Sequence, residues 1–139
     1  MLIGEYNYAV DEKGRLNFPA RFRDEMGESF TVARWLDNSL VAFPQEKWEI
    51  MAGRLLEKGF TKARDAQLYL FASAAPAQPD KQGRILLPPQ LREYAGLEKE
   101  VTILGVGDHA EIWNTDAWRK RSASMTAAGF ASALEELEL

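Results

Sequence analysis

Apolar residues occur along this chain in short runs, and nowhere do about 18 of them stand together, the length that a membrane span requires. Residues 6–10 and 16–18 alternate between apolar and polar positions and are rich in strand-forming residues. Gly14 lies in the turn-like stretch between them and supplies the positive φ that a tight hairpin needs. The pattern therefore predicts a β-hairpin over residues 6–18.

The residues after this hairpin predict a short helix, a second hairpin and a longer helix. Pro19 stops the second strand, because proline cannot donate to a β-ladder, and it suits the first turn of a helix over residues 20–26. Two further apolar runs, residues 30–33 and 40–43, flank a turn. Apolar residues on one face of residues 45–57 predict an amphipathic helix, which completes a ββ, short α, ββ, α unit.

This unit occurs twice. The stretch from Asp11 to Arg23 returns in register and without a gap from Asp80 to Arg92, about 69 residues later. Asp, Gly, Arg, Pro and a final Arg recur at matching places, with apolar residues filling the same positions between them. The second copy therefore predicts a short helix over residues 89–95, strands over residues 101–104 and 110–113, and a helix that Asn114 or Thr115 caps.

Two segments are less regular. The first strand of the second copy is predicted at residues 73–79, but Pro76 and Pro79 confine it to an edge or to positions without a ladder bond. Residues 60–72, between the copies, suit either a short helix or the start of a strand.

The fold class expected from these elements is mixed α+β, mainly β, built from two tandem units. The boundaries are residues 1–59 for unit 1, 60–72 for a connecting segment, 73–128 for unit 2 and 129–139 for an acidic amphipathic tail. Phe130, Leu134 and Leu137 share one face of the predicted tail helix. That helix is expected to pack on the surface of the protein.

Composition points to an oligomer in a reducing compartment. Each unit is near the lower size limit at which a core supports itself. The chain has no Cys and one His, so neither disulfides nor a Cys/His metal site can reinforce the core. Burial against the other unit and against further subunits is what remains, and an obligate oligomer is expected. We expect a cytoplasmic protein without a membrane partner, because no apolar leader sequence is recognisable.

The net charge of −4 conceals two basic regions. Residues 11–23 contain four Lys or Arg against two acids, and residues 80–92 contain three against one. The acidic tail offsets them with Glu135, Glu136 and Glu138. A polyanion partner is therefore compatible with the negative total charge.

The first hairpin tip and the helix after it carry most of the candidate DNA-binding residues. Arginine can meet guanine O6 and N7, or two phosphate oxygens, bidentately. The candidate contact residues are Lys13, Gly14, Arg15, Arg21, Arg23 and, in the second copy, Arg84. Asp11, Asp80 and Gly83 are expected to be structural, with Asp11 holding Arg15 or capping the turn.

An enzyme is not expected. Asp11 and Asp80 could act as an acid and base pair, but each lies beside an arginine that would keep it ionised. His109 is the only histidine and is expected in a hairpin turn. The four Trp residues are expected in the core rather than as stacking platforms. No metal, cofactor or small-molecule substrate is expected.

The doubled Asp-x-x-x-Arg motif, Asp11 to Arg15 and Asp80 to Arg84, resembles the MraZ family of bacterial transcriptional regulators. Residues 4–6 and 111–113 add to this resemblance, which covers essentially the whole chain. The resemblance implies two tandem AbrB-like (SpoVT-AbrB) swapped-hairpin domains that form a double-psi-like β-barrel core with flanking helices. It also implies a nucleoid-associated protein that binds double-stranded DNA, acts usually as a repressor and controls the operon for cell division and cell-wall synthesis.

The resemblance further implies a ring-like homo-oligomer on direct repeats in a promoter. A head-to-tail contact that closes yields a ring, and subunits that point the same way read direct repeats about 10 bp apart. Because unit 1 has Arg21 and Arg23 on its short helix where unit 2 has Gln90 and Arg92, unit 1 is expected to be the principal reader.

Three alternatives stay open at this point. One is an antitoxin-like swapped-hairpin protein whose acidic tail wraps a toxin. The second is a ring scaffold that does not bind nucleic acid. The third is a hydrolase that uses Asp11 and Asp80.

Overall fold

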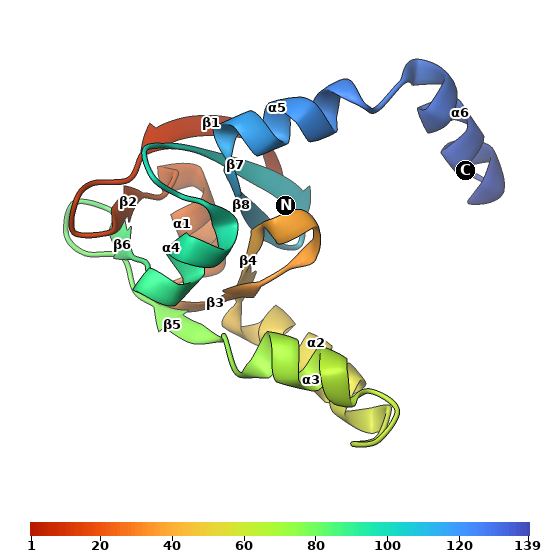
Figure 1. Cartoon of the computed structure of the whole chain (residues 1–139), viewed down its shortest axis with the longest axis horizontal. Coiled ribbons are helices and arrows are strands. Elements are labelled where there is room, and N and C mark those ends of the chain that lie inside the picture. The colour runs from red at the N-terminus through yellow and green to blue at the C-terminus, as the bar shows by residue number, and fades with distance from the viewer.

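The computed structural model describes all residues, 1–139, and shows the predicted unit twice (Figure 1). Unit 1 contains β1 (Leu2–Ala9), β2 (Arg15–Asn17), α1 (Ala20–Met26), β3 (Phe30–Arg34), a 3₁₀ turn η1 (Leu36–Asn38), β4 (Leu40–Pro44) and α2 (Gln45–Glu57). Unit 2 contains β5 (Ala75–Ala77), β6 (Arg84–Leu86), α4 (Pro89–Ala95), β7 (Glu100–Gly107), β8 (Ala110–Asn114) and α5 (Thr115–Ala123). Two further helices, α3 (Arg64–Phe71) and α6 (Ala127–Glu136), follow the units. The mixed α+β class is confirmed, with more residues in helices than in strands.

The strands of the two units are exchanged. In the main sheet the order is β1-β7-β8-β4-β3-β5, and all neighbours are antiparallel. The first strand of unit 1, β1, pairs with β7 of unit 2, and the first strand of unit 2, β5, pairs with β3 of unit 1. A separate pair, β2 with β6, also joins the units. The swapped-hairpin arrangement is therefore confirmed.

The first hairpin predicted for each unit does not form a regular two-stranded ladder. β1 and β2 are linked only by the isolated bridge between Val10 and Leu16. The sequence pattern correctly predicts a tight turn here, but the ladder bonds go to the other unit. The pairings do not close the main sheet into a barrel, because its order begins at β1 and ends at β5.

One core serves both units. Residues at matching places in the two copies are buried together in a cluster of 20 residues. The matching pairs include Leu16 with Ile85, Phe18 with Leu87, Phe22 with Leu91 and Met26 with Ala95. Burial of a large apolar side chain such as Phe22 or Leu91 contributes about 1.5–3 kcal/mol, and each unit supplies 10 of the 20 residues of the cluster. The core therefore explains how two very small units are stable together.

α2 and α3 form an antiparallel helical arm, defined here as residues 45–71, that projects from the body (Figure 1). Its base packs on a second, smaller cluster that includes Phe43 and Leu70. Gln67 Nε2 donates to the carbonyl oxygens of Leu55 and Gly59, at 3.1 Å each, and so fastens α3 to the end of α2. The ambiguous segment 60–72 is thus largely helical.

The tail does not pack as expected. α6 has no buried residue, and Figure 1 shows it standing away from the body beyond α5. Phe130 is 66% exposed and Leu137 is 68% exposed. The expectation of a packed tail is wrong for the isolated chain, because helical periodicity predicts an apolar face but does not identify what covers it.

No helix of the structure combines the length and apolar character that a membrane crossing requires.

Candidate nucleic-acid interface

Asp11 organises the first hairpin tip, residues 11–15. Its Oδ1 accepts hydrogen bonds from the backbone N–H groups of Lys13 and Arg15, both at 2.9 Å, and its Oδ2 accepts one from Arg15 Nε at 2.7 Å. The N–H of Gly14 donates to the Asp11 carbonyl oxygen at 3.0 Å. One aspartate therefore holds the turn and fixes the direction of the arginine.

The second tip, residues 80–84, repeats this geometry. Asp80 Oδ1 accepts from the backbone N–H groups of Gln82 at 2.8 Å and Arg84 at 2.9 Å, and Oδ2 accepts from Arg84 Nε at 3.3 Å. The structure thus places both aspartates in the same local role.

Both aspartates are held in the ionised form. Hydrogen bonds from the backbone N–H of Arg15 and from the arginine side chain lower the pKa of Asp11 and outweigh a partial desolvation. The backbone N–H of Arg84 is the main cause of the lowered pKa of Asp80. A carboxylate that already accepts three hydrogen bonds is a poor proton shuttle, which argues against an acid and base pair.

Each unit places an arginine over the glycine of the other unit's tip. We call these two residues, Arg23 and Arg92, the locking arginines. Gly14 has φ 83°, and a Cβ there would lie 2.6 Å from Arg92 Nε. Gly83 has φ 80°, and a Cβ there would lie 2.6 Å from Arg23 Cζ. Each arginine also donates through Nε to a backbone oxygen of its own unit, Arg23 to Phe18 and Arg92 to Leu87, both at 3.0 Å.

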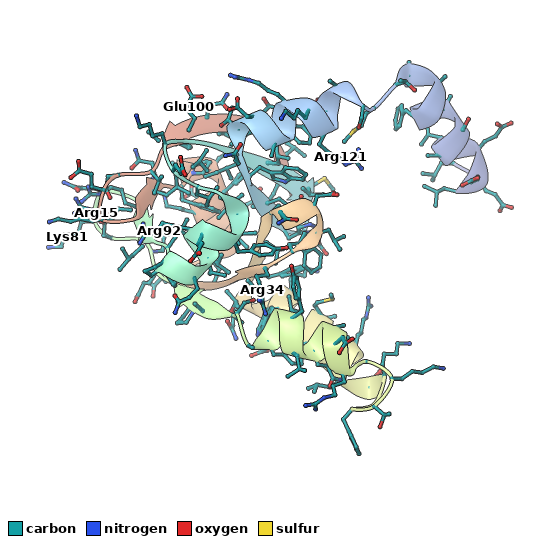
Figure 2. All side chains as sticks on the ribbon, viewed as in Figure 1. Arg15, Arg34, Lys81, Arg92, Glu100 and Arg121 are labelled. Carbon is teal, nitrogen blue, oxygen red and sulfur yellow. The ribbon has the colours of Figure 1, made fainter.

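These contacts bring the two tips together. The N–H of Phe18 donates to the Gly83 carbonyl oxygen at 3.0 Å, and the N–H of Leu87 donates to the Gly14 carbonyl oxygen at 2.9 Å. Figure 2 shows Arg15 and Lys81 at the same extremity of the molecule. We call residues 11–15 and 80–84 together the tip surface.

The tip surface is cationic and has free donors. Lys13 and Lys81 are exposed, and Arg15 and Arg84 are half-buried. Only the Nε of each of these arginines is bonded within the chain, so the terminal nitrogens are free to bind a ligand. Counting the two locking arginines, six cations stand against three carboxylates: Lys13, Arg15, Arg23, Lys81, Arg84 and Arg92 against Asp11, Glu12 and Asp80.

The comparisons with known proteins agree with the doubled motif. The family model "MraZ protein, putative antitoxin-like" matches the chain twice, over residues 1–69 and 70–139. The chain belongs to the MraZ family. A relative from Carboxydothermus hydrogenoformans, named "Transcriptional regulator MraZ", is 46% identical over 131 residues, which cover 92% of this chain and 91% of the relative. Another with that name, from Caldicellulosiruptor saccharolyticus, is 43% identical over 142 residues, which cover 99% of each.

The MraZ repeat boundary, between residues 69 and 70, falls inside α3 rather than in a linker. In this MraZ chain the structure brings together Lys13, Gly14, Arg15, Gly83 and Arg84 at the tips. Arg21 is exposed on α1 and forms no ion pair, whereas Arg23 lies against Gly83.

Sequence reasoning omitted Lys81 and the locking role of Arg92. Lys81 occupies the place that Glu12 has in the first copy, so comparing the two tips for matching residues missed it. Counting the charge of each turn would have found it. The role of Arg92 depends on the crossing of the two units, and no local sequence pattern of this MraZ chain contains that information.

His109 lies in the turn between β7 and β8, as expected, and apart from the tip surface. Its ring packs between Trp35 and Phe43, with centroid distances of 6.0 and 5.1 Å. Burial opposes protonation, but hydrogen bonds to Glu111 and Asp108 outweigh it and raise the pKa of His109. The imidazole therefore belongs to a local structural cluster.

The tryptophans also have structural positions. Trp113 is buried and contacts Trp118 edge to face at 5.5 Å, and Trp118 Nε1 donates to Glu5 at 2.8 Å. Trp35 and Trp48 pack against Phe43. None of them belongs to the tip surface.

Proposed function

We propose that this chain is a transcriptional regulator that binds double-stranded DNA through the tip surface. The observation that carries the proposal is that the two hairpin tips, about 69 residues apart in sequence, lie side by side, with Lys13 and Lys81 exposed and Arg15 and Arg84 half-buried. The names of the relatives, transcriptional regulators, support the same class of function.

The chemistry of the tips suits phosphates and base edges. Each Asp binds its Arg through Nε, which orients the guanidinium before any ligand arrives. The terminal nitrogens can then donate two parallel hydrogen bonds to phosphate oxygens or to guanine O6 and N7. Because the arginines are already oriented, less side-chain entropy is lost on binding.

Both tips contribute in this proposal. The expectation that unit 1 is the principal reader depends on Arg21 and Arg23, but Arg23 lies over Gly83 of the second tip just as Arg92 lies over Gly14 of the first, so the two arginines do not favour one unit. Lys81 gives the second tip a cation that the same place in the first tip lacks. We therefore assign comparable shares of binding to Arg15 and Arg84.

The proposal includes assembly and regulation. Copies arranged head to tail in a ring-like homo-oligomer would present their tip surfaces in one direction, which suits direct repeats in a promoter. Several weak contacts then gain by multivalency, which compensates for the net charge of −4. Bound across a promoter, such a ring acts as a repressor, here of the division and cell-wall operon, and the protein resides in the cytoplasm on the nucleoid.

Electrophoretic mobility shifts with a promoter fragment that carries direct repeats test DNA binding. Arg15→Ala and Arg84→Ala should each weaken specific binding by about 5- to 150-fold, since a bidentate contact contributes about 1–3 kcal/mol. The matched control is Arg119→Ala, which removes the same charge from an exposed position on α5, outside the tips, the arm and α6, and should bind as the unchanged protein does.

The salt dependence of the DNA-binding constant gives an independent test of the tip surface. The logarithm of the binding constant should fall with the logarithm of salt concentration with a slope of about −0.9 for each neutralised phosphate, and the slope should become shallower in both tip variants. Wild-type affinity in the double variant Arg15→Ala/Arg84→Ala would refute the tip surface as the DNA site.

A further inference from the structure

Most of the large apolar side chains that are exposed lie on two elements, the arm and the tail. The arm exposes Ile50, Leu56, Phe60, Leu68 and Tyr69, and the tail with the residues just before it exposes Met125, Phe130, Leu137 and Leu139. Each of these side chains is at least 45% exposed, although the ring of Tyr69 also contacts Tyr94 and Arg34. Exposed apolar groups gathered in this way indicate interaction surfaces.

α6 needs a partner of a particular kind. It has 10 residues, and isolated helices shorter than about 12–15 residues are marginal in water. Its Phe130, Leu134 and Leu137 share one face, so the partner must be apolar. Glu135, Glu136 and Glu138 lie at its C-terminal end, where the helix dipole is already negative, and the tail has no Lys or Arg. The partner must therefore also be basic.

The arm has both properties. Arg54, Lys58, Lys62 and Arg64 lie at or near its tip, and none of them forms an ion pair in the chain. Phe60, at the same tip, is 82% exposed. Lys62 and Arg64 stand at the start of α3, the positive end of that helix, so carboxylates are favoured there.

We propose that α6 of one copy docks on the arm of a second copy of this chain. The apolar face of α6 covers Phe60 and Leu68, and Glu135 and Glu136 approach Lys62 and Arg64. α6 and α3 then run antiparallel, with the acidic end of one beside the basic end of the other. The contact rests on the proposed ring and specifies how its subunits join: it connects two different surfaces, so it can run head to tail from copy to copy, and a closed ring satisfies it at every copy.

The occupant is a second copy because the geometry of one chain separates the two surfaces. Only residues 124–126 connect α6 to α5. Figure 1 shows α5 and α6 leaving the upper edge of the body while the arm leaves its lower edge. In an assembly each copy supplies one tail and one arm, so every tail finds an arm.

Site-directed cross-linking tests the contact directly, since the full chain contains no cysteine. Glu136→Cys and Lys62→Cys, prepared in two chains with different tags and mixed, should form a disulfide-linked heterodimer on oxidation. Glu136→Cys mixed with Lys13→Cys, which lies at the hairpin tip, should not. No linked heterodimer from the first pair in a sample that light scattering shows to be oligomeric would overturn the proposal, as would a strictly monomeric chain.

Charge reversal gives the second test and separates this inference from DNA binding. Glu135→Lys/Glu136→Lys should weaken self-association at least tenfold by light scattering, and adding Lys62→Glu/Arg64→Glu to the same chain should restore it. Leu36→Ser, which changes an apolar side chain that is 69% exposed on neither surface, should leave the mass unchanged. An unaltered mass in Glu135→Lys/Glu136→Lys overturns the docking but leaves the tip surface standing, because that surface is judged by the Arg15 and Arg84 variants.

Discussion

At the scale of single residues, the two turn glycines show what a sequence reveals and what it hides. The turn pattern predicts that Gly14 and Gly83 adopt positive φ, and they do, at 83° and 80°. It gives no sign that Arg92 and Arg23 from the opposite units lie over them. The reason is physical: backbone preference is local, whereas the approaching arginine comes from the shared core of both units.

Gly83→Ala should therefore destabilise the protein more than backbone strain alone explains. Positive φ costs an L-residue about 1–2 kcal/mol, and the new methyl group also displaces Arg23. Gly59→Ala is the matched control, because Gly59 has φ 86° and nothing within 4 Å of its added Cβ. Urea unfolding should show a larger loss for Gly83→Ala, and Arg23→Ala in the same chain should recover the excess. Equal losses at both glycines would contradict the locking role of Arg23.

The pH dependence of stability should include a contribution from His109. Its pKa in the folded protein is raised above the ordinary value of 6.5, because hydrogen bonds to Glu111 and Asp108 outweigh burial. A raised pKa stabilises the fold fully below pH 6.5, and the contribution disappears as pH rises through the folded value. The difference in unfolding free energy between the unchanged protein and His109→Gln should shrink as pH rises from 5 to 9, measured at intervals of about one pH unit. A difference that is constant with pH would show that the pKa of His109 is the same in the folded and the unfolded protein.

At the scale of elements, the sequence pattern predicts the positions of strands and helices closely, but it does not predict which elements pair or pack together. The predicted short helices, residues 20–26 and 89–95, match α1 and α4, because proline and glycine mark their ends. The strand predicted at residues 73–79 is shorter, Ala75–Ala77, and lies at a sheet edge as its prolines require. The predicted tail helix is present as α6. Its periodicity predicts an apolar face but gives no information about the surface on which that face packs.

Gln67→Ala should loosen the arm without unfolding the body. The side-chain amide makes the only side-chain hydrogen bonds between α3 and the end of α2, and each such bond contributes about 0.5–1.5 kcal/mol. Hydrogen exchange should rise in residues 55–67, while the core strands keep their protection. Gln90→Ala, on α4, removes an exposed amide without a hydrogen-bond partner and should change neither region. Unchanged exchange in the arm of Gln67→Ala would show that apolar packing alone holds α3.

At the scale of the whole molecule, the duplication was visible in the sequence, but the exchange of strands between the copies was not. A swapped and an unswapped arrangement bury the same apolar residues and use the same turns, so the residues from Asp11 to Arg23 and from Asp80 to Arg92 do not distinguish them. Only the family resemblance implied the swap. The observed pairing decides it, since all partners of β1, from Gly107 to Glu100, belong to unit 2.

The exchange predicts that neither half of the chain folds alone as a monomer. Residues 1–72 would leave β1 without β7 and expose Leu16, Phe18 and Phe22, whose neighbours include Ile85, Leu87 and Leu91. Apolar burial is the main favourable term in folding, and half of a shared core does not offset the conformational entropy of the ordered chain. Residues 73–139 lack the equivalent partners from unit 1.

Separately produced halves, residues 1–72 and 73–139, test this prediction by circular dichroism and NMR. Each alone should be unfolded at low concentration, or should fold only as concentration rises, when a second copy takes the place of the missing unit. An equimolar mixture should regain the spectrum of the full chain, because β1 then finds β7 and β5 finds β3. Linking the halves converts this encounter into an intramolecular one with an effective concentration in the millimolar range, so the full chain should stay folded at dilutions where the mixture dissociates. A half that gives a dispersed spectrum as a dilute monomer would show that a unit can close its own core, and the exchange would then be one of two accessible arrangements of this chain.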